Sequence, residues 1–135
     1  MKEKNKKKFT HLKIHSQYSI CEGALKISDL ADFCKKNKTH ALAICDTNNL
    51  CGAIEFSEKI SHVGTQPIIG IQIKFKHKNK YGKISLYAKD IEGYKNLTKL
   101  SSRSYLNIKE TEEPHCTIED LIKNNEGVVV LSGGI

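Results

Sequence analysis

The apolar and polar positions of this chain predict five β-strands separated by helices and loops. Residues 10–15 alternate between polar and apolar side chains, which is typical of a strand with one buried face. The other candidates are short apolar runs or segments rich in β-branched residues, both of which favour strands. The predicted strands are residues 10–15, 41–45, 67–75, 83–88 and 127–131.

Helical spacing of apolar residues connects these strands. The predicted helices are residues 28–38, 50–60 and 91–105, with a shorter one after Thr117. Ser28 is the candidate N-cap of the first helix, and Thr117 with Asp120 three residues later resembles a capping box. Leu30, Phe33 and Cys34 are expected on the inner side of the first helix. The apolar spacing of the other two rests on Leu50, Ala53, Ile54, Ser57 and Ile60, and on Ile91, Tyr94, Leu97, Thr98 and Tyr105, which fall near one helical face.

The alternation of strands and helices favours an α/β fold with a parallel sheet or barrel. The strands expected to be parallel neighbours are residues 10–15, 41–45 and 67–75. In such folds chemistry lies in loops after the carboxyl ends of the strands, and His15, Asp46 and Gln72 lie at or near such ends. No covering helix follows the strand at 127–131, which we interpret as truncation because an exposed parallel strand invites association.

The composition is that of one globular domain with a basic start. Of its 135 residues, 39% are hydrophobic and 27% charged, and no apolar run approaches the roughly 20 residues of a membrane span. Residues 1–8 carry a net charge of +4 out of +7 for the chain. We predict a basic flexible tail at 1–8 and the domain at 9–135. No apolar signal core follows Phe9, so a cytoplasmic location is expected.

Several kinds of site are not indicated. The five cysteines are odd in number and include no CxxC pair, so we expect reduced thiols packed as small hydrophobes. Nucleophile elbows, phosphate-binding loops and dinucleotide fingerprints are absent from the sequence. Beyond the tail, basic and aromatic residues form no stripe along the sequence that would track a nucleic-acid strand.

Two polar stretches could carry chemistry. On a strand, residues two apart share a face, so His11, Lys13 and His15 would point the same way. An H-x-H pair would favour a metal site. Here His11 is paired with Lys13 and Lys13 with His15, so neither pair consists of two histidines, and the Lys13 ammonium repels a cation. The histidines are therefore interpreted as hydrogen-bonded residues or as ligands. Asp46 is interpreted as an Asx turn or as an acid.

Three longer stretches follow one another along the chain. Residues 11–24 read HLKIHSQYSICEGA, residues 41–56 read ALAICDTNNLCGAIEF, and residues 66–74 read QPIIGIQIK. They resemble HLHVHSEYSLLDGA, ALAITDHGNLFGAVEF and KPIIGCEVYV of the PHP domain family, in the form that opens the alpha subunits of bacterial DNA polymerase III. LYAKDIEGYKNLTKLSSRSY and NEGVVVLSGG match later stretches, so the resemblance spans residues 9–134 in the family's order.

The resemblance implies the truncated N-terminal part of a distorted, TIM-like β/α barrel with metal ions at its strand ends. Lys13 and Thr47 stand where histidines belong. Gln72 replaces a glutamate, and Lys83 falls where a histidine is frequent. The expected vestigial site consists of Lys13, His15, Glu22, Thr47, Gln72 and Lys83. We expect no catalytic residue and no bound metal in this chain.

A lysine in place of the metal would balance the remaining carboxylates. Lys13 is expected within ion-pair reach of Glu22 or Asp46, with His15 beside them. In the alternative reading, Lys13 extends to water and pairs with nothing.

The resemblance also implies a function. The parent protein would be a DNA-directed DNA polymerase, a nucleotidyltransferase of DNA replication, with its polymerase residues, their Mg²⁺ and its DNA contacts in domains absent here. This chain would be an inactive scaffold, without cofactor or membrane contact, that docks the proofreading exonuclease subunit and the remaining alpha-subunit domains. A standalone metal-dependent PHP phosphoesterase is the alternative, and a lysine-tailed nucleic-acid binder is a third reading.

Overall fold

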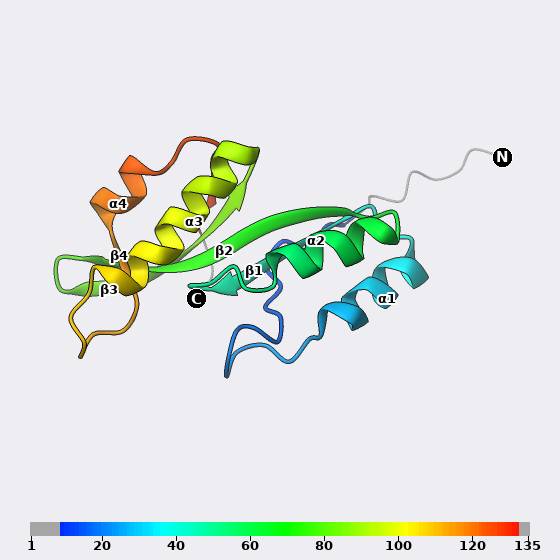
Figure 1. Ribbon diagram of the computed structural model, residues 1–135, viewed down its shortest axis with the longest axis horizontal. Coiled ribbons are helices and arrows are strands. Elements are labelled where there is room, and N and C mark those ends of the chain that lie inside the picture. The colour runs from blue at the N-terminus through cyan, green and yellow to red at the C-terminus, as the bar shows by residue number, and fades with distance from the viewer. Residues whose placement is uncertain (1–8, 133–135) are drawn as a thin grey trace.

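The structure, a computed structural model, describes residues 9–132, so the predicted tail at 1–8 lies outside the described residues. The elements in chain order are α1 (Ile27–Asn37), β1 (Ala41–Thr47), α2 (Ala53–His62), β2 (Gln66–His77), β3 (Lys80–Ala88), α3 (Ile91–Leu106), β4 (Cys116–Thr117), α4 (Ile118–Lys123) and β5 (Val128–Leu131). In Figure 1 the long strand β2 links the end that carries α1 and α2 to the end that carries α3 and α4. None of the helices within 9–132 is long and apolar enough to cross a membrane.

The sheet is mixed. Its strand order is β1-β2-β3-β5, and the short strand β4 pairs with β2 away from this path. β1 and β2 are parallel neighbours, as predicted, whereas β3 returns antiparallel to β2 in a hairpin and β5 is antiparallel to β3. Thr47 lies opposite Gln72, and Gln72 lies opposite Ser85, so these three polar side chains share one face of the sheet.

Helices cover the other face of the sheet. Leu42 and Ile44 of β1 belong to a core cluster that they share with residues of α1 and α2. Ile71 and Ile73 of β2 belong to a second cluster that includes residues of α3. The alternating residues of β1 point the opposite way, where Ala43 and Cys45 contact Tyr87.

The predicted strand at 10–15 is wrong. This segment lies beside β1, where the Ala43 amide donates to the His11 carbonyl at 3.0 Å and the Cys45 amide donates to the Ile14 carbonyl at 2.7 Å. His11 and Ile14 are three residues apart, but their partners are only two apart. The mismatch prevents a regular hydrogen-bond ladder, so the side chains of residues 11, 13 and 15 do not share the expected common face.

The two predicted helix starts had different outcomes. Helix α1 begins at Ile27 after Lys26, with no side-chain cap, so the prediction of Ser28 as its N-cap is wrong. Helix α4 begins with the predicted capping box: the Thr117 hydroxyl accepts from the Asp120 amide at 3.1 Å, and the Asp120 carboxylate accepts from the Thr117 amide at 3.1 Å. Among the residues with helical spacing, those that are buried are Leu30, Cys34, Ala53, Ile60 and Leu97, whereas Phe33, Ile54, Ile91 and Tyr105 are exposed.

Helix α3 approaches the end of β3 and the turn before β5 closely at Gly93. Its buried residues are Gly93, Asn96, Leu97, Leu100 and Ser104. A Cβ atom added at Gly93 would lie 1.9 Å from the Gly127 carbonyl oxygen. The Asp90 carboxylate caps the helix by accepting from the Gly93 amide at 2.9 Å.

The cysteines divide into two groups. Cys34, Cys45 and Cys116 are buried, as expected for thiols that pack as small hydrophobes. Burial raises the pKa of the Cys116 thiol to about 12. Cys21 and Cys51 are exposed, so the prediction does not hold for them.

Candidate functional site

Asp46, at the end of β1, holds the loop at residues 16–25 against the sheet. Its carboxylate accepts hydrogen bonds from the Ser16 amide at 2.6 Å, the Ser16 hydroxyl at 2.7 Å and the Ser19 hydroxyl at 2.6 Å. Asp46 is only 2% exposed, so its oxygens serve these protein donors. The Asx-turn reading is wrong for Asp46, because the Asn48 amide donates to the Gln72 carbonyl instead.

Glu22 lies at the centre of a second group of polar contacts. Its carboxylate accepts from the Lys83 ammonium at 2.9 Å and from the Thr47 hydroxyl. The Thr47 hydroxyl lies 3.4 Å from Oε1 of Gln72, which is buried. The Thr47 hydrogen bond, then that of Lys83, lowers the pKa of Glu22, and the charge of nearby His15 contributes.

Five of the six expected positions therefore gather at the carboxyl end of β1, at the middle of β2, on β3 and in the segment before α1. These are His15, Glu22, Thr47, Gln72 and Lys83. Nδ1 of His15 lies 3.5 Å from the Ser19 hydroxyl, which bonds to Asp46.

Lys13 does not join this group. The ion pair predicted between Lys13 and Glu22 or Asp46 is wrong: among residues 9–132 the partner of Glu22 is Lys83, and Asp46 bonds to serines. Instead the Lys13 charge acts on the Cys45 thiol, whose pKa burial raises and Lys13 partly lowers. The irregular pairing of residues 10–15 explains the difference, because Lys13 and His15 no longer share a strand face.

A metal ion fits this set of residues poorly. Within residues 9–132, no three His, Cys, Asp or Glu side chains lie close enough together to hold one. Thr47 and Gln72 are neutral, and Lys83 places an ammonium beside the remaining carboxylate of Glu22. Carboxylates and neutral imidazoles, not ammonium groups, bind the metals of such sites.

Asn48 is a structural residue that the sequence interpretation missed. It has a φ of 55°, and its side chain accepts from the Lys74 amide at 3.0 Å and donates to the Pro114 carbonyl at 3.0 Å. Its own carbonyl accepts from the Ser101 hydroxyl at 3.2 Å. The signal in the sequence was an asparagine directly after a strand, since asparagine tolerates the left-handed region better than most residues.

A polar hollow of about 230 Å³ lies over this network. It is lined by Tyr18, Ser19, Ile20, Glu22, Thr47, Asn48, Asn49 and Tyr105. Tyr18 is fixed by its hydroxyl, which donates to Glu55 of α2 at 2.8 Å. The arrangement offers hydrogen bonds and one neutralised carboxylate, but no activated nucleophile among the described residues.

The model of the PHP domain family matches residues 11–135. The chain belongs to the PHP domain family.

The curated proteins to which the chain is similar are alpha subunits of DNA polymerase III. The chain is similar to the DNA polymerase III subunit alpha of Thermus aquaticus, with 38% identity over 96% of this chain and 12% of the relative. The Borreliella burgdorferi subunit is 40% identical over 95% of this chain and 12% of its own length. The Haemophilus influenzae subunit is 33% identical over 94% of this chain and 11% of its own length. The chain spans only 11–12% of the length of these relatives.

Solved structures support the fold. A protein assigned to the metal-dependent phosphoesterases, from Bifidobacterium adolescentis, has a TM-score of 0.56 at 17% identity, over 70% of this chain and 32% of its own. An amidohydrolase from Chromobacterium violaceum has a TM-score of 0.54 at 18% identity, over 70% and 34%. The likeness confirms the predicted α/β class and part of a PHP-type barrel, and at these identities it concerns the fold alone.

Proposed function

We propose that this chain is the PHP region of a bacterial DNA polymerase III alpha subunit, a DNA-directed DNA polymerase. The observation that carries the proposal is the 33–40% identity to alpha subunits over almost the whole chain. The polymerase residues and their Mg²⁺ would then lie outside these 135 residues.

Within that subunit, the chain would act as a scaffold without a metal of its own. The Lys83–Glu22 ion pair and the Thr47 hydrogen bond support this role, because they neutralise the carboxylate that a metal would otherwise bind. Its proposed partner is the proofreading exonuclease subunit of the same polymerase. The rest of the alpha subunit would contact the face of the sheet that the helices do not cover.

Binding to the exonuclease subunit tests the proposal. The 135-residue chain and the purified exonuclease subunit of the same organism would be mixed and followed by size-exclusion chromatography and calorimetry. We expect a complex that forms equally well with and without EDTA. Absence of a complex, or its loss in EDTA, would contradict the proposed role.

A metal-dependent phosphoesterase is the second candidate, which the likeness to the Bifidobacterium adolescentis protein favours. It requires hydrolysis of bis-p-nitrophenyl phosphate when Mn²⁺ or Zn²⁺ is added. We expect no turnover above the buffer rate, since Thr47, Gln72 and Lys83 do not provide metal ligands. Metal-dependent turnover that Glu22→Gln abolishes would favour the phosphoesterase over the scaffold.

A further inference from the structure

Three aromatic rings from separate parts of the chain gather on the surface at the end of α1. The Phe9 and His11 ring centres are 4.7 Å apart, and those of His11 and Phe33 are 6.4 Å apart, both pairs edge to face. Phe9 is 76% exposed and Phe33 is 44% exposed. We call Phe9, His11 and Phe33 the aromatic platform; its members are too far apart in the sequence to form a visible stripe.

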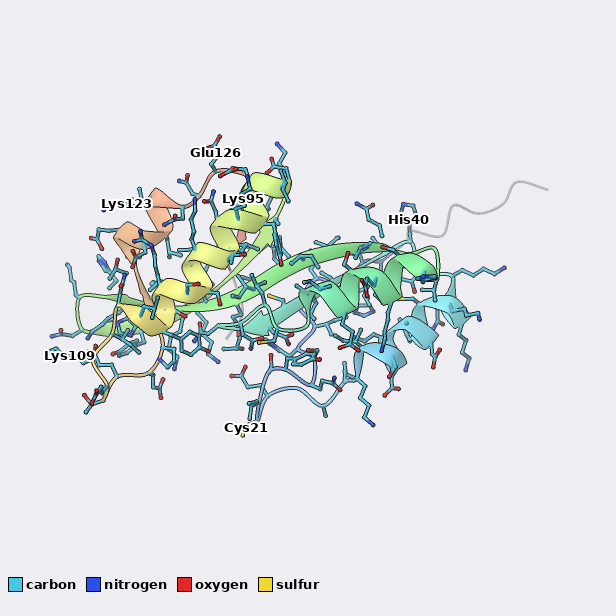
Figure 2. All side chains as sticks on the ribbon, in the orientation of Figure 1. Cys21, His40, Lys95, Lys109, Lys123 and Glu126 are labelled. Atoms are coloured by element: carbon cyan, nitrogen blue, oxygen red, sulfur yellow. The ribbon has the colours of Figure 1, made fainter. Side chains whose placement is uncertain are left out.

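Basic side chains border the platform. Lys38 and His40 line the same surface hollow as the three rings, a space of about 240 Å³. Lys36 lies three residues after Phe33 on α1 and so on the same side of the helix. Figure 2 labels His40 at the end of the molecule that carries α1.

The charge near the platform is predominantly positive. Asp29 lines a neighbouring hollow with His11 and Phe33, and the lysines Lys35 and Lys36 lie in the last turn of α1. The sequence adds five lysines and one glutamate in residues 1–8, directly before Phe9.

Regular structure holds His11 and Phe33 of the platform in place. The His11 carbonyl accepts from the Ala43 amide of β1, and Phe33 is part of α1. Lys38 caps α1 in the left-handed conformation, with its amide bonded to the Cys34 carbonyl. Thr39, the residue after Lys38, is fixed by the Thr65 hydroxyl, which donates to the Thr39 carbonyl at 2.8 Å. A ligand that binds here would therefore order little of the protein backbone.

We propose that the aromatic platform and its basic border bind single-stranded DNA. Exposed rings accept unpaired bases by stacking, and neighbouring lysines neutralise the phosphates that connect them. A duplex keeps its bases stacked inside and would use only the lysines. The choice of DNA over RNA rests on the proposed function in DNA replication.

The test uses the 135-residue chain and a fluorescein-labelled oligo(dT) of about 15 nucleotides, long enough for one such site. Fluorescence anisotropy would be measured at rising salt concentration, beside an oligo(U) and a duplex of the same length. We expect the oligo(dT) to bind more tightly than either, with an affinity that falls as salt rises.

Variants separate stacking from charge. Phe9→Ala and Phe33→Ala should each weaken oligo(dT) binding at least about fivefold, because each removes a stacking surface. The matched control is Tyr81→Ala, an aromatic residue 49% exposed on β3, which should leave binding unchanged. Melting temperatures would show that each variant folds.

The charge variants have their own control. Lys36→Gln with Lys38→Gln should weaken binding and flatten its salt dependence. Lys95→Gln with Lys123→Gln removes the same charge from α3 and α4, which Figure 2 shows at the other end of the molecule, and should have a much smaller effect.

Several results would overturn the proposal. These are unchanged binding in both phenylalanine variants, complete loss of binding when residues 1–8 alone are removed, and equal affinity for oligo(U) or duplex. If Phe33→Ala instead disrupts the exonuclease complex and leaves oligo(dT) binding intact, the platform is a protein interface. If the unaltered chain forms no complex with the exonuclease, that result counts against the proposed function. Failure of the proposed function and failure of the DNA-binding proposal can therefore be told apart.

Discussion

The Asp46 carboxylate accepts three hydrogen bonds from one loop, and this number determines what a substitution there would cost. Asp46→Asn would place an amide donor against serine donors in a buried site. We expect a loss of about 2–4 kcal/mol in the free energy of unfolding, measured by urea denaturation. The exposed carboxylate of Asp32 provides the control: Asp32→Asn should change stability by about 0.5 kcal/mol or less. Equal effects of the two substitutions would contradict this role of Asp46.

The Lys83–Glu22 pair should matter less, since the side chains are 42% and 37% exposed and solvent screens them. We expect a coupling energy of about 0.5 kcal/mol from the double-mutant cycle of Lys83→Met and Glu22→Gln. Coupling indistinguishable from zero would mean that the pair contributes nothing to stability.

The same pair predicts a dependence on pH. The pKa of Glu22 is lower in the folded chain than its ordinary value of 4.5. Its stabilisation is therefore present above pH 4.5 and is lost as the pH falls through the lowered folded-state value. Urea denaturation between pH 7 and pH 3 should show a smaller loss of stability for Glu22→Gln than for the unaltered chain. Parallel pH profiles would rule out a contribution from Glu22.

At the scale of elements, Gly93 sets how closely α3 can approach the sheet. Helix propensity alone predicts that Gly93→Ala stabilises the chain by about 1 kcal/mol. The contact with the Gly127 carbonyl reverses the sign, because a methyl group there forces the backbones apart. We expect a loss of about 2 kcal/mol or more in urea denaturation. Ser102→Ala, on the exposed side of α3, is the control and should cause little change.

The elements were predicted better than their faces. Strands β1, β2, β3 and β5 and the capping box of α4 follow from residue types that act locally. Apolar spacing found Leu97 on the inner side of α3 but missed Gly93 and Ser104, and it included Tyr105, which is exposed. Residues 10–15 failed for a related reason, because alternation cannot reveal a mismatch with a partner strand.

The residues of the candidate site were predicted better than their contacts. The resemblance placed His15, Glu22, Thr47 and Gln72 near one another, and the structure brings them together. It did not identify Lys83 as the partner of Glu22, because that contact depends on the antiparallel return of β3. The register of this hairpin is set by its short turn, in which Lys78 has a φ of 53° that its residue type does not predict.

At the scale of the whole molecule, metal content is the clearest expectation. The purified chain should contain no stoichiometric zinc, manganese or iron by elemental analysis, because Thr47, Gln72 and Lys83 offer no ligand set. About one tightly bound ion per chain would contradict this.

Ligands could be restored by substitution. A variant with Thr47→His, Gln72→Glu and Lys83→His, which keeps His15 and Glu22, should gain stability when zinc is added. The gain would be about 2.7 kcal/mol at a hundred times its dissociation constant. The unaltered chain with the same zinc is the control and should not change. An equal shift in both would mean that zinc acts elsewhere.

The two core clusters on the helix-covered face have no member in common, and the 12-residue strand β2 takes part in both: Ile69 packs against the first, and Ile71 and Ile73 belong to the second. Such a division favours two cooperative units that open separately, one with α1, α2 and β1 and the other with β3, α3 and β5. Native-state hydrogen exchange should then yield two distinct opening free energies, and the central amides of β2 should exchange with the slower unit. A single opening free energy for both ends would mean that β2 couples them completely, so that the chain unfolds as one unit.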